Sequence, residues 1–330
     1  MKNIRLSFCI PTYNFGEFIG ETLESIVQQA TDEVEIIVGD GGSTDNTAEV
    51  VRGFQSRFPR LTYHNFGKKG GVDLDLSKTV ELAQGDYCWL MSSDDVLKPG
   101  AVERVLNEIR GNHDVYLLNR TTCDRNLKPG WRQRFWLSSS IGDSVFHFSD
   151  RSELLGYLNA SNFCGSLFSY VSSIVVRRDK WNAIGFDERL NGSNYAHVFR
   201  LFTILKMEGS SLRYCKDSIV YCRGDNDSFA AKGICNRLRI DFDGYRLLAD
   251  LLFAEEPVRR AFKAVVKRGM RWYALSRMKG ESKDSEAWKK LEEVMSDYGY
   301  SPQELFLISV LGSSQLYVAL TRTIKHGLRI

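Results

Sequence analysis

The order in which apolar sequence patterns follow one another is the feature that most constrains the fold of this chain. Over about the first 120 of its 330 residues, short apolar runs alternate with longer segments in which apolar residues recur every three or four positions. The apolar runs predict buried strands at residues 6–10, 34–38, 61–65, 86–91 and 115–119. The segments between them predict amphipathic helices at residues 15–29, 46–58, 72–82 and 100–109. Repeated strand–helix units of this size favour an α/β fold with a mainly parallel sheet and helices on both faces.

The alternation fades after residue 119. We expect a further strand within residues 166–177, a helix at 195–207 and a strand at 219–223, before a mostly helical remainder. A chain of this length usually forms two units. We therefore divide it into an α/β domain at residues 1–225 and a helical C-terminal region at 226–330, which could contact a membrane or a protein partner.

The cysteines and the apolar runs bear on the compartment. The chain has seven cysteines, an odd number, and no CxxC pair, so we expect neither a zinc site nor a disulfide framework. We recognise neither a signal peptide nor an apolar run of the ~18 residues that a membrane-spanning helix needs. These features favour a cytoplasmic location.

The net charge of +3 conceals a basic C-terminal region. Residues 258–330 carry 14 Lys and Arg against 7 Asp and Glu, which gives this region a net charge of +7. Near its end, apolar residues recur every fourth position and basic residues share another face; the two sets are Leu316, Leu320, Ile324 and Leu328, and Arg322, Lys325 and Arg329. Such a helix can lie on an anionic membrane, or it can dock as an ordinary helix on the rest of the protein. We do not expect nucleic-acid binding, because clustered aromatics between the basic residues and known motifs are both missing.

Three polar loops, PTYN, GDGGSTD and SSDD, each follow a predicted strand. Ligands of such sheets bind at the carboxyl ends of the strands, so we expect the three loops to converge on one cleft. In SSDD, the adjacent carboxylates of Asp94 and Asp95 can bind Mg²⁺ or Mn²⁺, which take oxygen ligands and bridge to phosphates. The alternative is that the two acids cap the helix that begins near Pro99.

The loop GDGGSTD places an acid and two glycines at a strand end. Asp40 can accept a hydrogen bond from a base or a sugar hydroxyl, and Gly41 lets the backbone approach a ligand closely. The alternative is a simple turn, with Asp45 capping the next helix. The motifs GxGxxG and GxxxxGK[ST] are absent, which argues against hydride transfer and nucleotide hydrolysis.

Taken together, FCIPTYN, IIVGDGGSTDNT and LAQGDYCWLMSSDD resemble, in order and spacing, the inverting GT-A glycosyltransferases of family 2. The resemblance covers residues 6–101 well and extends more weakly to about residue 223. The segments GVDLD, SSDD, NYAHVF and RGDNDSF resemble the abequosyltransferase branch, which extends O-antigen or similar polysaccharide repeat units. The resemblance implies a GT-A nucleotide-sugar-binding fold of Rossmann-like type, followed by the helical extension.

The resemblance also implies roles for particular residues. A donor nucleotide-diphosphate sugar would be bound by the strand-end loops and by one later arginine: Pro11, Thr12, Tyr13, Asn14, Asp40, Gly41, Asp75, Lys78, Ser93, Asp94 and Arg223. Asp94 and Asp95 match the metal-binding DxD region, with Asp95 as the direct ligand and Asp94 nearer the ribose. Ser92 stands where the family usually has a first acid, and serine is a poorer metal ligand. We therefore expect weaker dependence on Mn²⁺ or Mg²⁺.

The catalytic base follows less directly from the resemblance. The family usually has a GFDE-like segment and then an acidic ED pair, whereas here GFDERL is followed by NYAH. His197 could take the proton of the acceptor hydroxyl, because a neutral imidazole titrates near the working pH. Asp187 and Glu188 are the alternatives, and a lone helical histidine is also often structural.

These observations predict an inverting glycosyltransferase that moves a sugar from a nucleotide-diphosphate sugar to a saccharide acceptor in surface polysaccharide synthesis. The branch resemblance implies an acceptor linked to polyprenyl diphosphate, at the cytoplasmic face of the inner membrane. One alternative is a sugar nucleotidyltransferase, which would need a better glycine-rich triphosphate loop than GDGGSTD. Another is a non-catalytic nucleotide-sugar-binding protein of the same fold, consistent with the missing ED pair.

Overall fold

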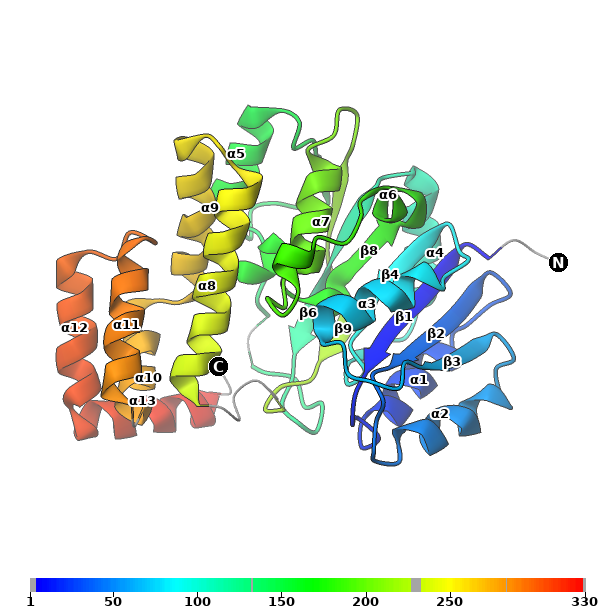
Figure 1. The fold of residues 1–330 in the computed structure, drawn as a ribbon, viewed down its shortest axis with the longest axis horizontal. Helices are drawn as coiled ribbons and strands as arrows, with labels where there is room; N and C mark the ends of the chain where they lie inside the picture. Colours follow the sequence, from blue (N-terminus) through cyan, green and yellow to red (C-terminus); the bar gives the residue numbers. More distant parts are fainter. Residues whose placement is uncertain (1–3, 132, 227–232, 283, 329–330) are drawn as a thin grey trace.

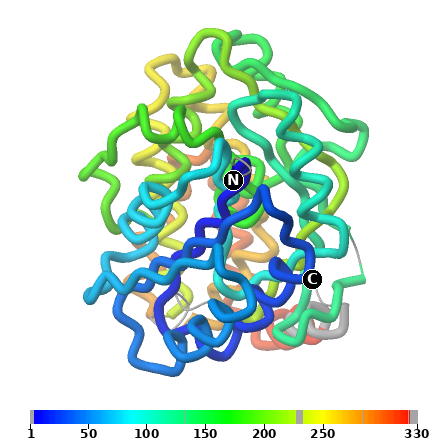
Figure 2. Tube along the Cα trace, turned by 90° about the vertical axis from the view of Figure 1, so that its right-hand side faces the viewer, coloured from blue at the N-terminus to red at the C-terminus, as the bar shows by residue number. Residues whose placement is uncertain are grey.

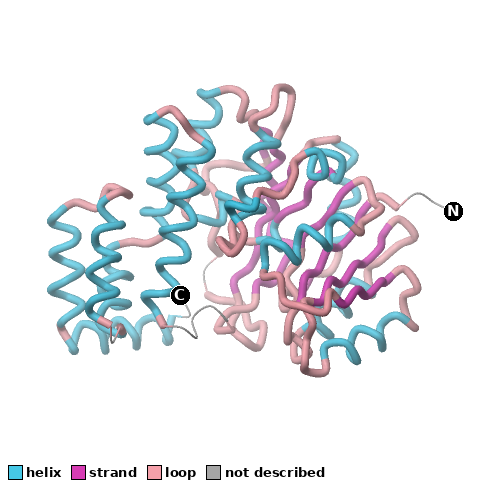
Figure 3. Tube along the Cα trace, in the orientation of Figure 1, coloured by secondary structure: helices cyan, strands magenta, loops and turns pink. Residues whose placement is uncertain are grey.

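The computed structural model describes residues 4–131, 133–226, 233–282 and 284–328, and in the last helix it leaves the side chains of 322 and 324–328 undescribed. A nine-stranded sheet occupies one side of the molecule and a group of helices the other (Figures 1 and 3). The strands follow the order β3-β2-β1-β4-β8-β6-β9-β5, and β7 pairs with β9 beside this path.

The first half of the sheet is parallel throughout. Its strands are β1 (Leu6–Thr12), β2 (Val34–Asp40), β3 (Leu61–Asn65) and β4 (Tyr87–Leu90). The helices between them are α1 (Ile19–Val27), α2 (Thr47–Gln55) and α3 (Val72–Glu81). The alternating side chains of β1 enter two different cores: Phe8 faces Leu23 of α1, whereas Cys9 faces the core that contains Leu76 of α3. Helices on both faces thus explain why these strands are apolar along their whole length.

The second half of the sheet is mixed. It contains β5 (Val96–Leu97), β6 (Val115–Thr122), β7 (Ser144–Phe146), β8 (Ile174–Arg177) and β9 (Leu212–Cys222). β8 runs antiparallel to both β4 and β6, and β6 runs parallel to β9, so β6 and β9 point in the same direction as β1 to β4. Six strands therefore share one direction, which confirms the predicted mainly parallel α/β sheet.

Three predictions in this half need correction. Only the last four residues of the segment 166–177 form a strand; the rest contains short 3₁₀ turns, in which Ser166 and Ser173 donate to backbone carbonyls instead of leaving them to a ladder. β9 is an 11-residue strand that begins well before residue 219. α4 (Ala101–Glu108) begins after Gly100, and α5 (Arg151–Ala160) was not expected.

The remainder of the chain is helical, as predicted. After α6 (Arg178–Ala183) and α7 (Ala196–Leu205), the helices are α8 (Ile234–Leu252), α9 (Glu256–Gly269), α10 (Trp272–Glu281), α11 (Ser285–Ser296), α12 (Pro302–Ser313) and α13 (Gln315–Leu328). The ring of Phe202 in α7 packs edge-on against Phe253 and Phe262, so the first of these helices share a core with the sheet. Viewed from the side, the blue parallel strands lie in front of the orange and red helices (Figure 2).

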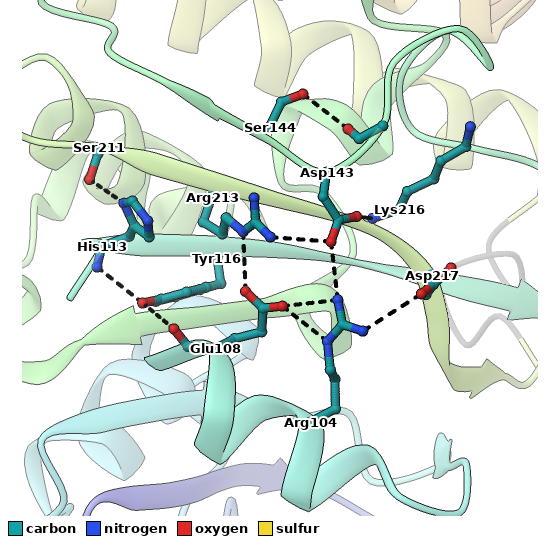
Figure 4. Close-up of polar contacts among 11 residues, drawn as sticks. Arg104, Glu108, His113, Tyr116, Asp143, Ser144, Ser211, Arg213, Lys216 and Asp217 are labelled. Atoms are coloured by element: carbon teal, nitrogen blue, oxygen red, sulfur yellow. Dashed lines mark hydrogen bonds and ion pairs between the residues drawn. The ribbon is translucent and has the colours of Figure 1, made fainter. Parts of the chain in front are cut away.

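The amino ends of β6 and β9 carry an ion-pair network (Figure 4). Arg104 of α4 lies 2.9 Å from Glu108 and 3.0 Å from Asp143, and Arg213 of β9 lies 3.1 Å and 3.2 Å from the same two acids. Two guanidinium groups thus share two carboxylates, and Asp217 adds a third acid 3.7 Å from Arg104. The network ties α4 to the start of β9, at the opposite end of the strands from their carboxyl ends.

Candidate active site

The carboxyl ends of β1, β2 and β4 lie side by side, because the strands are in parallel register: Thr12 pairs with Asp40, and Cys9 with Leu90. The loops that follow β1 and β2 are bonded together. The Asn14 amide donates to Ser43 Oγ at 2.8 Å, and Asn14 Oδ1 accepts from the Thr44 amide at 2.8 Å. Asn14 has a positive φ of 56°, a conformation that asparagine tolerates. The expected convergence of PTYN and GDGGSTD is therefore present.

Asp40 is completely buried at the end of β2. Its Oδ1 accepts bonds from the Ser43 amide at 2.7 Å and the Ser43 hydroxyl at 2.8 Å, and its Oδ2 accepts from the Tyr63 hydroxyl at 2.6 Å. Burial, and then this bond to Asp40, raise the pKa of Tyr63 to about 12, so the phenol stays a donor. Asp40 thus fixes the loop after β2 through Ser43 and joins it to Tyr63 of β3.

A cradle forms around Gly41. A Cβ at this glycine would lie only 2.9 Å from Asp75 Oδ2 and 3.6 Å from the ring of Tyr13. Lys69, which the sequence did not single out, holds its ammonium 4.1 Å from the centre of the Tyr13 ring. Burial raises the pKa of Asp75, which accepts from the Gly70 amide at 3.1 Å. Tyr13, Gly41 and Asp75 are therefore brought together as expected.

Other predicted donor-site residues lie near this cradle. Pro11 and Thr12 are the last residues of β1 rather than part of a loop. The Lys78 ammonium lies 5.4 Å from the centre of the Phe66 ring, and Ser93 is buried beside the two acids.

Asp95 follows β4 and is only 2% exposed. Its Oδ2 accepts from the Ser172 hydroxyl at 2.5 Å and its Oδ1 from the Arg223 amide at 2.9 Å. Burial, and then the neighbouring charge of Asp94, raise the pKa of Asp95 to about 7. This carboxyl thus carries the like-charge strain that a bound cation would relieve.

Asp94 is half-buried, and its carboxylate accepts bonds from Ser92 and Asn226. The N-cap of α4 is Gly100, with a φ of 81° and no side-chain bond. The alternative that the two acids cap this helix is therefore wrong.

Arg223 is buried and binds backbone rather than an open site. Its Nε donates to the Asp94 carbonyl at 2.8 Å and its Nη1 to the Arg125 carbonyl at 2.6 Å, while its Nη2 lies 3.2 Å from Glu21. Arg120 of β6 is a second buried cation, which lies 3.6 Å from the Trp136 ring centre and whose pKa burial lowers to about 10. The two guanidinium groups bring positive charge to the strand ends that carry the acids.

The donor atoms at this edge suit a hard cation that is completed by a ligand. In the part of the chain that the structure describes, no group of three or more His, Cys, Asp and Glu side chains is placed to hold a metal ion. Asp94 and Asp95 alone could hold Mg²⁺ or Mn²⁺ if diphosphate oxygens and water supply the other ligands, which is a usual arrangement for Mg²⁺.

His197 lies at the start of α7 and is 4% exposed. Its Nε2 lies 3.0 Å from the Phe168 carbonyl, which can only accept, so Nε2 carries the proton. Nδ1 is left as a buried acceptor without a hydrogen-bond partner among the described residues. Burial lowers the pKa of His197 to about 4. His197 lines a small cavity together with other residues that include Asp73, Ser77, Trp181, Asp187 and Arg200.

The other two candidate bases are arranged differently. Asp187 accepts from the Arg189 amide at 3.0 Å and forms an ion pair of 2.6 Å with the same residue, whose hydrogen bond lowers the pKa of Asp187. Glu188 is exposed at the start of a short 3₁₀ turn, Glu188–Leu190.

One loop links His197 to the paired acids. Phe168, at one end of this loop, binds His197, and Ser172, at the other end, binds Asp95 and accepts from Trp89 Nε1 at 2.9 Å. Asp73 of α3 adds a second support, because it accepts from the Asn194 amide at 2.8 Å and the Ala196 amide at 2.9 Å. Sequence reasoning missed Ser172, Arg120, Lys69 and Asp73; Asp73 lies within GVDLD and so had a signal.

Comparisons with known proteins agree with this architecture. Residues 7–207, more than half of the chain, match the family described as Glycosyl transferase family 2. The chain is 35% identical over 274 residues to the abequosyltransferase RfbV of Salmonella typhimurium, which covers 81% of each protein.

Two solved structures show similar folds. TarS 1–349 of S. aureus, in complex with UDP-GlcNAc, superposes with a TM-score of 0.63 at 15% identity, over 98% of this chain and 92% of that one. The mannosyltransferase PcManGT of Pyrobaculum calidifontis, in complex with GDP-Man and Mn²⁺, gives a TM-score of 0.54 at 15% identity, over 94% and 88%. At such identities these likenesses concern the fold alone. With the family match over most of the sheet and its strand-end loops, the chain belongs to glycosyl transferase family 2 and is a glycosyltransferase with a GT-A-like fold.

Proposed function

We propose that this glycosyltransferase moves a sugar, with inversion, from a nucleotide-diphosphate sugar to a lipid-linked saccharide in surface polysaccharide synthesis. The observation that carries the proposal is the strand-end edge, where the cradle of Tyr13, Gly41 and Asp75 lies on the loops next to Asp94 and Asp95. Support comes from the relatives, since RfbV is an abequosyltransferase and the two similar structures hold UDP-GlcNAc and GDP-Man.

The donor would lie along this edge with its nucleoside in the cradle and its diphosphate at the acids. Tyr13 would stack on or beside the base, Asp40 Oδ2 would accept from a base or ribose donor, and the glycine backbone at Gly41 would let the nucleotide approach. Mg²⁺ or Mn²⁺ on Asp94 and Asp95 would neutralise charge on the leaving diphosphate. Arg223 would hold the Asp94 backbone in place for this role.

His197 is our proposed partner for the acceptor hydroxyl. Its Nδ1 has no hydrogen-bond partner among the described residues, His197 lines the cavity, and its low pKa keeps the ring neutral at neutral pH. A nitrogen with a pKa near 4 is a weak general base, so its contribution would lie in orienting the hydroxyl as well as in accepting its proton. Asp187 and Glu188 remain the alternative bases.

The acceptor is proposed from the relationship to an abequosyltransferase and from one exposed side chain. Trp131 is 63% exposed on the segment after β6. This segment is tied to the site, since Gly130 donates to the Thr122 carbonyl at 2.9 Å and Arg125 accepts from Arg223. An exposed indole offers a flat apolar face on which a sugar ring can lie. A polyprenyl diphosphate carrier would place this saccharide at the cytoplasmic face of the membrane.

The test is turnover with a panel of nucleotide-diphosphate sugars, Mn²⁺ or Mg²⁺, and lipid-linked saccharides extracted from bacterial membranes. Release of nucleoside diphosphate that requires the saccharide would support transfer. Release of pyrophosphate from a nucleoside triphosphate and a sugar phosphate would instead identify a nucleotidyltransferase. Donor binding without turnover on any acceptor would favour a non-catalytic binding protein.

A further inference from the structure

The last two helices present an apolar surface to solvent. We define the elbow surface as Phe306 and Val310 of α12 with Leu316 and Leu320 of α13, whose exposed fractions are 66%, 49%, 80% and 58%. Residues 305–321, which contain all four, include no Asp, Glu, Lys or Arg. Scattered exposed apolar side chains are ordinary, but here four lie within one uncharged segment, and large exposed apolar patches usually mark an interaction site.

The apolar side chains of the elbow surface cannot be buried by a rotation of the two helices, because the other side of α12 and α13 already packs against α10. A Cβ at Gly312 would lie 2.9 Å from the Ser276 carbonyl, and one at Gly280 would lie 2.2 Å from Val318, so the helices are in close contact there. Lys279 donates to Ser309 Oγ at 3.0 Å, and the Tyr317 hydroxyl donates to the Tyr273 carbonyl at 3.1 Å. The exposed side chains are therefore held outward by the fold.

The shape of the elbow suits the surface of a bilayer. Among the described residues, no single helix is long and apolar enough to cross a membrane. α12 and α13 reach the necessary length and composition only as a pair, and they are bent by 91° at their junction. A bend of this size presents Leu316 and Leu320 beside the end of α12 and lets α13 lie parallel to a surface.

The charge of the C-terminal region indicates what kind of partner binds the elbow surface. The sequence after Thr321 contains Arg322, Lys325 and Arg329 and no acid, and residues 258–330 carry a net charge of +7. Anionic lipid headgroups attract such a basic segment. A second copy of the chain would instead oppose one basic region to another. The elbow surface thus fits an anionic lipid surface better than self-association.

The elbow also lies on the same side of the molecule as the site. In Figure 1, α13 runs along the lower border, and β1 descends from the N-terminus toward that border, so its carboxyl end points the same way. Figure 2 places the red helix and the loops of the blue strands at the same level.

We propose that the elbow surface binds an anionic lipid bilayer and thereby turns the carboxyl edge of the sheet toward the membrane. The orientation rests on the proposed function, in which the acceptor is carried by a lipid; binding to the bilayer does not.

The test is co-sedimentation of the full chain with vesicles of phosphatidylcholine alone and of phosphatidylcholine with phosphatidylglycerol. We expect binding to the anionic vesicles, weakened by salt, and about tenfold or greater loss in the triple variant Phe306→Ser, Leu316→Ser, Leu320→Ser. These side chains are exposed, so the variant should fold. A control variant, Leu82→Ser with Met207→Ser, removes apolar side chains that are 37% and 38% exposed elsewhere and should bind like the parent.

Equal vesicle binding by the parent and the triple variant would overturn the proposal, as would no binding to either vesicle. Sedimentation velocity without lipid tests whether a second copy of the chain binds the elbow surface instead. A dimer that the triple substitution dissociates would make the elbow surface a contact between copies and overturn the proposal. Calorimetric binding of the donor, measured on the same variants, should be unchanged. A protein that binds donor but not vesicles would thus refute the membrane inference and leave the proposed function standing.

Discussion

The Ser172 hydroxyl donates a 2.5 Å hydrogen bond to Asp95, and these two residues are 77 positions apart. The same hydroxyl accepts from the Ser92 amide at 2.9 Å, and the Ser172 backbone carbonyl accepts from the indole of Trp89 in β4, the strand that precedes the acids. The Ser172 hydroxyl and the Arg223 amide therefore orient the two oxygens of the buried carboxylate that we assign to the metal.

Replacing this serine should weaken metal binding. In Ser172→Ala, Asp95 loses a hydrogen bond to its charged form, so we expect Mn²⁺ affinity in the presence of the nucleotide sugar to fall about tenfold or more, as is typical when a partner that orients a metal ligand is lost. Ser173→Ala is the matched control, because the Ser173 hydroxyl donates to the Tyr170 carbonyl at 2.7 Å and not to either acid. Titration of Mn²⁺ followed by calorimetry measures both; equal affinities would contradict the role of Ser172.

The cradle around Gly41 gives a sharper test. Gly41→Ala places a Cβ 2.9 Å from Asp75 and 3.3 Å from the Lys69 backbone, so we expect donor affinity to fall by about tenfold or more. Gly53→Ala is the control, since nothing lies within 4 Å of its Cβ and it sits inside α2, where alanine should add about 1 kcal/mol of stability. If the Gly41 variant binds the donor as the parent does, the nucleotide does not lie in the cradle.

Asp73 should matter for folding stability. It accepts two backbone amides at the start of α7, so Asp73→Asn should lower the free energy of unfolding by about 1–3 kcal/mol. Urea unfolding measures the loss, with the exposed Asp86→Asn as the comparison. Equal midpoints and slopes for the two variants would show that Asp73 does not support α7.

His197 predicts a particular pH dependence of stability. Its pKa is about 4 in the folded protein and about 6.5 when unfolded, so the unfolded chain binds the extra proton between these values. The contribution of His197 to the free energy of unfolding is then fully present above about pH 6.5. It falls as the pH drops toward 4, by about 3 kcal/mol in total. His197→Gln should flatten this part of the curve, whereas the exposed His147→Gln should not. Asp95, whose folded pKa is about 7, contributes with the opposite sign over the same range, so the slope of the parent must be compared with that of His197→Gln. Equal slopes for the two proteins would contradict the buried neutral imidazole.

Replacing Trp131 should raise KM for the saccharide acceptor and leave the affinity for the donor unchanged. Because its side chain is 63% exposed, Trp131→Ala should leave folding unchanged. We expect KM for the saccharide acceptor to rise about tenfold, as stacking on an aromatic face contributes roughly 1 kcal/mol or more, with calorimetric donor affinity unaltered. An unchanged acceptor KM would remove Trp131 from the proposal.

Sequence reasoning succeeded where the pattern is local. The apolar runs of β1 and β2 are buried on both faces, so their composition predicts them directly, and the loops after them follow from parallel topology. It failed at 166–177, because serine hydroxyls that bond the backbone replace a ladder in a stretch that is apolar in composition. Asp73 and Ser172 were missed as site residues because their partners lie 77 or more positions away, which no local pattern encodes.

The most direct measurement is calorimetric titration of nucleotide-diphosphate sugars with Mn²⁺ and with EDTA, on the parent, Asp95→Ala and the half-buried Asp94→Ala. Our account predicts binding of one donor class that requires the metal and is lost in both variants. Because Asp94 is partly exposed, its variant should keep its fold and secure the result if Asp95→Ala unfolds. Equally tight binding with EDTA, or in Asp94→Ala, would contradict the claim that the paired acids hold a cation against the diphosphate.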